Sequence, residues 1–492
     1  MGAQPHRTAP EDRVPITHML LYGAGAFVNN LLAGSIGAMM IVLNLGLGMN
    51  PALVGLLGAI PRLMDALTDP IMGYISDNTK TRWGRRRPYM FVGAIAVGII
   101  FILLWQLPDG KSESFYYWYF LIGSLLFYLA YTVFATPWVA IGYEMTPDYH
   151  ERTRLMGVQN FIGQLAYFVP PWLLVVMQHD ALFDNMVDGA AGVSIMIGVF
   201  VISVGVLPAI FLRERLQDHK LVEANTLAAK TPVHKEPAMV VLASRLADFF
   251  KGFGAALSFV PFLKLCIATF LVFNGFILIS SFQVYVVIYY VFEGDKELGA
   301  QYAGYIGTLS TLSTFAVIAF VTWLSTQIGK RRAFAVATLL SMIGYASKWF
   351  CYTPDAPWLT LIPAPLIAFG LGGLFTLMPS MMADVVDYDE LKTGERREGM
   401  YGSIYWWVVK LGMAVALAGG GFLLNATGFD VELDGAQSEQ TIFLLRLFDA
   451  TIPAIASGFA IWAVATFSIS QKRAMEIREE LEAIRGASPT AA

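Results

Sequence analysis

Apolar residues fill most of the chain in long blocks, and short polar segments separate these blocks. A helix that crosses a membrane needs about 20 consecutive apolar residues. By this criterion we expect twelve membrane-spanning helices, near residues 18–46, 51–77, 88–107, 115–143, 155–178, 190–212, 261–292, 300–326, 333–353, 357–385, 398–425 and 440–470. The composition agrees, because 56% of the 492 residues are hydrophobic and 14% are charged. The pattern predicts an all-α membrane protein.

The Lys and Arg residues predict how these helices are oriented. They gather at the termini and in the loops of one side, whereas the opposite loops hold only Lys111 and Lys296. Positively charged loops stay in the cytoplasm, so we expect both termini to be cytoplasmic. Residues 1–17 lack the apolar core and cleavage site of a signal peptide. We therefore expect a multi-pass protein of the plasma membrane, specifically of a bacterial inner membrane.

The longest polar interruption divides the expected helices six and six. We expect a cytoplasmic N-terminal segment (1–17), a six-helix half (18–212), a cytoplasmic linker with an interfacial helix (213–260), a second six-helix half (261–470) and a cytoplasmic tail (471–492). A short repeat links the halves, since GRRR at 84–87 and GKRR at 329–332 follow corresponding spans. Repeated halves of this kind are typical of secondary transporters.

The second span carries Arg62, Asp65 and Asp69 within an otherwise apolar segment. Residues four apart share one face of a helix, and ionised groups at membrane depth are costly unless they are compensated. Two neighbouring acids therefore take up a proton or share a metal ion. The hydroxyl groups of Thr68 and of Thr132 in the fourth span would complete an oxygen shell for a hard cation such as Na⁺. The residues leave Na⁺ and H⁺ open.

Other classes of function find little support in the sequence. Walker A, His-Glu-x-x-His and Gly-x-Ser-x-Gly motifs are absent, so we expect neither an enzyme nor a bound cofactor. A repeated filter or charged ring, as a channel needs, is also absent. A formal net charge of -4 gives no reason to expect nucleic-acid binding. The expected partners are a small-molecule substrate and the lipid bilayer, and the protein is expected to function as a monomer.

Several motifs resemble one known family of transporters. They are DALTDPIMGY at 65–74, TRWGRRRPY at 81–89, ADVVDY at 383–388 with Glu390 and Lys392, VVKLG at 408–412 and YGAGAF at 22–27. The chain resembles the glycoside-pentoside-hexuronide:cation symporters, the melibiose permease-like branch of the major facilitator superfamily, over residues 18–470. The resemblance implies the fold of that superfamily and cation-coupled symport of a sugar or glycoside by alternating access.

The resemblance also implies which residues bind the coupling ion. Asp65, Asp69 and Thr132 match ion-binding positions of the family, but the asparagine that serves as a further ligand there is Thr68 in this chain. This departure makes H⁺ as acceptable as Na⁺. The residues expected at the site are thus two acids and two hydroxyls.

The substrate positions of the family match less well. They correspond to Asn30, Ala135, Val139, Asn160, Phe375 and Lys410, of which only the lysine is unchanged. Because the family's sugar-binding carboxylates are missing, galactoside specificity does not transfer. We expect substrate contacts from Asn30, Asn160, Phe375, Lys410, Trp138 and Tyr405. Lys410 needs an anionic partner, which is either a group of the substrate or one of the aspartates of the second span. An acidic solute, or a lysolipid or other amphiphile, is the alternative cargo.

The charged ends of the spans have two interpretations. The resemblance places the following residues where the two halves meet on the cytoplasmic side, so their ion pairs would act as a gate: Asp77, Arg85, Arg86, Asp384, Asp387 and Arg396. The alternative is a solvated surface whose ion pairs contribute little.

Overall fold

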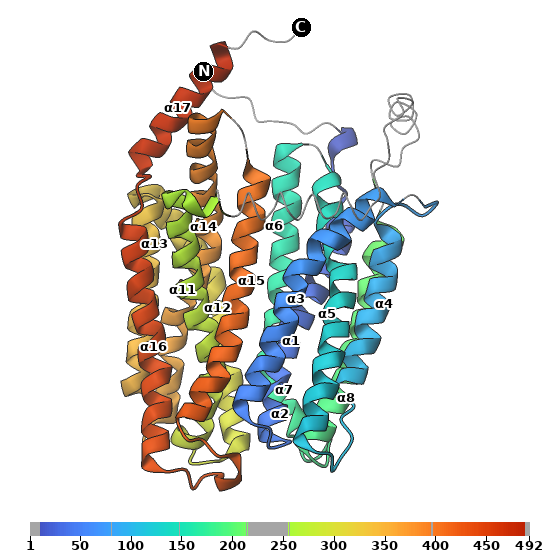
Figure 1. Cartoon of the computed structure of the whole chain (residues 1–492), viewed down its shortest axis with the longest axis vertical. Coiled ribbons are helices and arrows are strands. Elements are labelled where there is room, and N and C mark those ends of the chain that lie inside the picture. Colours follow the sequence, from blue (N-terminus) through green and yellow to red (C-terminus); the bar gives the residue numbers. More distant parts are fainter. Residues whose placement is uncertain are drawn as a thin grey trace. The chain divides into compact units, whose positions relative to one another are not determined.

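The computed structural model describes residues 10–79, 81–146, 148–212, 214, 254, 256–394 and 397–487, and these residues are almost all helical (Figure 1). Twelve of the described helices are long and apolar enough to cross a membrane. The expected number of spans and the all-α fold class are thereby confirmed. The interfacial helix expected before residue 256 lies almost entirely outside the described residues.

The chain divides into two compact units, one made of Met1–Met49 with Ile60–Ala243 and the other of Asn50–Ala59 with Ser244–Ala492. The first unit contains the helices α1 (Ile16–Met39), α2 (Ile41–Leu45), most of α3 (Pro51–Asn78), α4 (Arg87–Leu104), α5 (Glu113–Glu144), α6 (Tyr149–Leu165), α7 (Pro170–Met177) and α8 (Met186–Phe211). Within this unit α4 packs on α5 and α8, and α1 packs on α6 and α8.

Glycines allow some of these helices to approach closely. A Cβ atom at Gly93 of α4 would lie 2.6 Å from the backbone nitrogen of Phe134 in α5, and one at Gly98 would lie 2.9 Å from the carbonyl oxygen of Gly198 in α8. Small residues at such crossings let the backbones of membrane helices touch. They set how deeply α4 sits against its neighbours.

Polar side chains mark where several helices begin. Ser112 accepts a hydrogen bond from the backbone N–H of Phe115, Asp148 accepts one from Glu151, and Asn185 accepts from Val187 and Asp188. Such caps satisfy backbone N–H groups that the first helical turn leaves without partners. They explain why α5, α6 and α8 start where they do.

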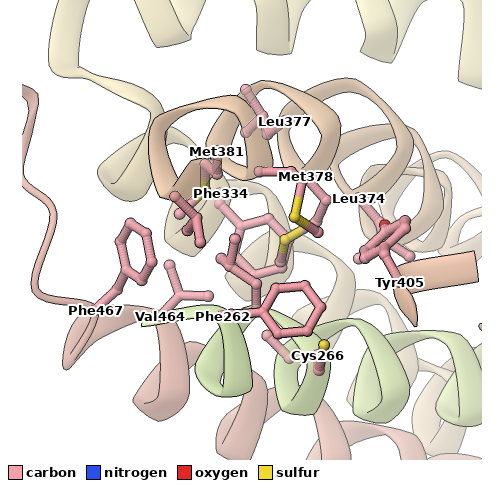
Figure 2. Packing of buried hydrophobic residues seen from close by; sticks show 14 of the residues in the cluster. Phe262, Cys266, Phe334, Leu374, Leu377, Met378, Met381, Tyr405, Val464 and Phe467 are labelled. Atoms are coloured by element: carbon pink, nitrogen blue, oxygen red, sulfur yellow. The ribbon is translucent and has the colours of Figure 1, made fainter. Parts of the chain in front are cut away.

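The second unit contains α11 (Val260–Val286), the π-helical turn η4 (Val287–Val291), α12 (Lys296–Ile328), α13 (Lys330–Cys351), α14 (Pro363–Thr393), α15 (Glu398–Ala426), α16 (Glu439–Ala465) and α17 (Gln471–Ala487). Its core joins α11, α13, α14 and α16 through aromatic, aliphatic and methionine side chains. Figure 2 shows Phe262, Phe334, Met378 and Phe467 meeting there. Met378 and both Phe262 and Phe334 are fully buried.

Several boundaries and one helix differ from the sequence-based expectation, and the fifth span, for example, begins at Tyr149 rather than near residue 155. The tenth span continues to Thr393 rather than ending near residue 385, and the last one ends at Ala465 rather than near residue 470. The tail forms helix α17, which the sequence analysis did not predict. Its Ile477 and Leu481 are 1% and 5% exposed and lie one turn apart, so they bind α17 to the core of the unit.

Candidate functional site

The acids of the second span lie opposite a row of hydroxyl groups. Thr132 Oγ1 donates to Asp65 Oδ1 at 2.9 Å, and Thr136 Oγ1 donates to Asp69 Oδ1 at 3.1 Å. Both pairs of residues are four apart on their own helix, so α3 and α5 meet in two successive turns. Asp65 and Thr132 are buried, with 2% and 1% of their surfaces exposed.

Thr68 joins the same cluster. Its hydroxyl oxygen lies 3.2 Å from that of Thr132 and donates to the backbone carbonyl of Asp65 at 3.2 Å. The cluster therefore offers two carboxylates and three hydroxyls, and all of its ligands are oxygen atoms. Oxygen ligands suit hard cations such as Na⁺. Among the described residues, no group of three or more His, Cys, Asp or Glu residues that could hold a metal ion occurs.

Thr136 is a member of this cluster that the sequence analysis did not single out. A signal for it exists, because Thr136 lies one helical turn after Thr132, as Asp69 does after Asp65. Two hydroxyl residues with the same spacing as the two acids therefore predict that Thr136 faces Asp69.

Arg62 lies one turn before Asp65 and is 8% exposed. Its guanidinium carbon lies 4.8 Å from the ring centroid of Tyr128, which is within the range of a cation–π contact. It also interacts electrostatically with Asp65, Tyr131 and Tyr167. The unit therefore places one permanent positive charge near Asp65.

A chain of hydrogen bonds begins next to this cluster. The hydroxyl of Tyr131 donates to Asn29 Oδ1 at 2.7 Å, Asn29 Nδ2 donates to Asn30 Oδ1 at 3.1 Å, and Asn30 Nδ2 donates to the carbonyl of Gly163 at 2.9 Å. The chain connects α5 to α1 and α1 to α6. It links the expected substrate residue Asn30, through Asn29, to the tyrosine that directly precedes Thr132.

The other expected substrate residues of the first unit have different surroundings. Asn160 of α6 is exposed. Trp138 of α5 is 3% exposed, donates its Nε1–H to the carbonyl of Tyr22 at 3.1 Å and packs against the Tyr22 ring. The indole therefore connects α5 to α1 within the core of the unit.

The expected substrate residues of the second unit also differ from one another. Phe375 is 43% exposed and meets Phe273 edge to face, with the ring centroids 5.9 Å apart. Tyr405 is 4% exposed and belongs to the core seen in Figure 2. Lys410 of α15 is partly exposed. An aromatic surface is thus accessible at Phe375, whereas Tyr405 has a packing role.

The charged loop after α3 is held by partners of its own unit. Arg86 pairs with Asp77 at 2.7 Å and with Glu144 at 2.8 Å, and Arg85 also pairs with Glu144. The carboxylate of Glu214 accepts hydrogen bonds from the backbone N–H groups of residues 85, 86 and 87, at 3.0, 2.8 and 3.0 Å. A carboxylate at this position caps the start of α4 and interacts favourably with its helix dipole.

The corresponding loop of the second unit has a similar arrangement. Lys330 pairs with Asp384, with its Nζ atom 2.7 and 2.9 Å from the two carboxylate oxygens. Arg331 donates to the carbonyl of Phe467 near the end of α16, much as Arg87 donates to the carbonyl of Ala209 near the end of α8. Asp387 is partly buried, and Arg396 lies outside the described residues. Both loops therefore bind partners of their own unit, although Arg331 is aligned with Arg86 in the repeat and the contacts of these two arginines differ.

Comparisons with known proteins agree with this architecture. The chain is 24% identical to the isoprimeverose transporter of Lactiplantibacillus pentosus, over 94% of this chain and 90% of that protein. It is 22% identical to a glucuronide carrier protein homolog of Escherichia coli K12, over 94% of each chain. It is also 22% identical to a sphingosine-1-phosphate transporter of Xenopus tropicalis, over 97% of this chain and 93% of that protein.

Solved structures show the same fold. A bacterial homolog of the human lysosomal transporter Spinster, in an inward-facing and unoccupied conformation, matches with a TM-score of 0.64 and 15% identity, covering 92% of this chain and 96% of that chain. The model of the family described as MFS/sugar transport protein matches residues 21–471. The resemblance found in the motifs is confirmed. The chain therefore belongs to the MFS/sugar transport protein family and is a multi-pass membrane transporter, not an enzyme.

Proposed function

We propose that the protein is a secondary active transporter that couples the entry of a cation, Na⁺ or H⁺, to the symport of a sugar or glycoside. Asp65 and Asp69 form the coupling site, and Thr68, Thr132 and Thr136 line it. The observation that carries the proposal is the pair of acids on a membrane-spanning helix with a hydroxyl group donating to each.

The charges of this cluster explain why a cation would bind. Two neighbouring carboxylates repel each other among apolar helices when both are ionised. A bound proton or monovalent metal ion reduces this repulsion.

Coupling then follows from linkage. If the bound cation raises the affinity for the solute, the solute raises the affinity for the cation by the same factor. The empty carrier and the doubly loaded carrier exchange between inward-facing and outward-facing states, and the singly loaded carrier does not. Ion pairs of Asp77, Arg85, Arg86, Asp384, Asp387 and Arg396 at the cytoplasmic ends of the helices would regulate this exchange.

The nature of the solute follows from the polar groups near the site. The amides of Asn29 and Asn30 suit the hydroxyl groups of a sugar, and relatives of the chain are named for isoprimeverose and glucuronide transport. Lys410 is a candidate for contact with the carboxylate of an acidic sugar such as a uronide. Asn160 and Phe375 are further candidates for contact with the solute.

A second candidate is the transport of a phosphorylated or otherwise acidic amphiphile. Two observations favour it: a relative is named for sphingosine-1-phosphate, and two sugar-binding positions of the family hold the apolar residues Ala135 and Val139. A thermal-shift screen of the purified protein separates the two candidates. Its probes are isoprimeverose, methyl β-glucuronide and sphingosine-1-phosphate, each with Na⁺ or choline at acidic and neutral pH.

The coupling assignment is tested by Asp69→Asn. This substitution removes the acid but keeps the shape, so it should abolish cation-driven accumulation in vesicles, while exchange of labelled for unlabelled solute continues. The exposed loop residue Asp109 provides a matched control, since Asp109→Asn should accumulate solute like the wild type. Normal accumulation by Asp69→Asn would refute the coupling assignment.

A further inference from the structure

We propose that Tyr131 couples the cation site to the substrate amides, because its hydroxyl is the first donor of the hydrogen-bond chain that runs through Asn29 and Asn30 to Gly163. This inference rests on the proposed function, since it needs a cation at Asp65 and a solute at Asn30. It goes beyond that function by naming the residue through which the cation site affects the substrate site. Tyr131 is a positioning residue and need not touch either ligand.

The position of Tyr131 on α5 gives it access to both sites. It directly precedes Thr132, whose hydroxyl donates to Asp65 at 2.9 Å. Consecutive residues of a helix point about 100° apart, so Thr132 faces α3 while Tyr131 reaches α1 through Asn29. A cation that changes the bonding of Thr132 acts on the same helical turn that holds Tyr131.

The hydrogen-bond chain is directional. Every donor points from α5 toward α6, and the three distances are 2.7, 3.1 and 2.9 Å. Hydrogen bonds in series polarise one another, so a change at the first bond reaches the last. The amide of Asn30 has two N–H groups and two acceptor lone pairs, and the chain uses one of each. The chain therefore orients Asn30 while its remaining capacity can serve a solute hydroxyl.

Arg62 provides an electrostatic link between the acids and Tyr131. The buried guanidinium interacts with both Asp65 and Tyr131, and its Nε–H has no hydrogen-bond partner among the described residues. When a cation lowers the negative charge at Asp65, the pull of that acid on Arg62 weakens, so Arg62 acts more strongly on the phenol of Tyr131. A phenol beside a cation is a better donor, which strengthens its bond to Asn29.

The far end of the chain depends on a glycine. A Cβ atom at position 163 would lie 3.0 Å from Asn30 Nδ2 and 3.1 Å from the Cβ of Ala26. Only a residue without a side chain lets the amide reach the carbonyl of α6 without displacement. Gly163→Ala should therefore disturb the orientation of Asn30 without touching the cation site.

The experiment compares Tyr131→Phe with Tyr119→Phe, a matched loss of one hydroxyl on the same helix. Tyr119 bonds to the carbonyl of Leu103 and lies outside the chain. The affinities for isoprimeverose and methyl β-glucuronide are measured by calorimetry with Na⁺ or choline and at two pH values. In the wild type and in Tyr119→Phe, the cation should tighten binding of the better probe about tenfold, a typical coupling factor.

In Tyr131→Phe this factor should fall to about one, while the Na⁺ or proton affinity measured without solute stays within about threefold of the wild type. A factor equal to that of the wild type would overturn the inference and leave the proposed function intact. Loss of cation binding in Tyr131→Phe would also overturn it, because Tyr131 would then be a cation ligand. If the wild type shows no cation effect with either probe, the proposed function fails, and the inference fails with it.

Asn29→Leu and the double variant test the same chain independently of the phenol. Two residues that act through one hydrogen bond are not additive. Asn29→Leu alone and the double variant should therefore both bring the factor to about one, as Tyr131→Phe does, whereas a wild-type factor in Asn29→Leu would contradict a shared chain. Protein that elutes as a single peak on size exclusion and retains its Na⁺- or proton-induced thermal shift excludes misfolding as the cause.

Discussion

Both compact units bury charged residues among membrane-spanning helices, but they balance these charges differently. The first unit gathers Asp65 and Asp69 with Arg62 and adds hydroxyl donors to the acids. The second unit pairs Lys348 of α13 with Asp449 of α16 one to one, at 2.7 Å, with 1% and 2% of the two side chains exposed. Lys348 also lies 5.0 Å from the ring centroid of Tyr352.

This difference distinguishes charged residues that bind a cation from charged residues that stabilise the packing of two helices. A buried pair of equal and opposite charges needs no further ion, so Lys348 and Asp449 fix the register of two helices. The two acids of the first unit instead lie with hydroxyl groups in a cluster of oxygen atoms, which is the kind of ligand set that a mobile cation can occupy. An ionisable residue in a membrane helix therefore indicates function only after its partners are counted.

The largest expected effect comes from breaking the pair in the second unit. Lys348→Met or Asp449→Leu leaves one charge buried alone, which should cost about 3–5 kcal/mol of stability. The double variant should recover most of this loss and still transport. Thermal unfolding in detergent measures the stability, and the exposed pair Lys472 and Glu476, 3.9 Å apart, is the control whose removal should cost less than about 1 kcal/mol. A double variant that folds but cannot transport would show that the pair has more than a structural role.

A second variant should convert the first arrangement into the second. Thr136→Lys places a permanent cation beside Asp69, whose Oδ1 atom accepts from the Thr136 hydroxyl at 3.1 Å. The added ammonium should replace the mobile ion, so we expect at least a tenfold loss of the Na⁺ or proton dependence of solute binding, since a single buried counter-ion competes directly with it. Thr136→Met has a similar length without the charge, so it should weaken that dependence less than Thr136→Lys does. Binding that still responds to the cation in Thr136→Lys would count against Asp69 as a ligand.

The smallest effects should come from the basic loop that each unit has after its second helix of the repeat, around Arg87 in the first unit and Arg331 in the second. Arg87→Gln removes donors to the carbonyls of Ala209 and Ile210, and Arg331→Gln removes a donor to the carbonyl of Phe467. These groups are partly exposed, so each change should cost about 1 kcal/mol or less. Similar losses of thermal stability would support equivalent roles in the two repeats. A loss confined to one unit would mean that the loops differ in function.

Periodicity along the chain determined much of this protein. Hydropathy predicted the twelve spans, the repeated GRRR and GKRR motifs predicted two related loops, and the spacing of Asp65 and Asp69 predicted that they share a face. Each span depends on about 20 consecutive residues, and the shared face of the two acids depends on a spacing of one helical turn. The sequence predicts the spans and the shared acidic face well, because the backbone hydrogen bonds of a membrane helix are satisfied within the helix itself.

Tertiary structure decided which helices exchange hydrogen bonds and charges. Nothing local in the sequence pairs Lys348 with Asp449, Tyr131 with Asn29 or Glu214 with the start of α4, because these partners are about a hundred residues apart. Their meeting depends on the rotation of each helix about its axis and on how closely glycines allow two backbones to approach. α17 likewise exists where it does because Ile477 and Leu481 find an apolar surface in the second unit. The sequence by itself therefore determined the spans and their acidic face, and packing between distant helices decided which charges are balanced.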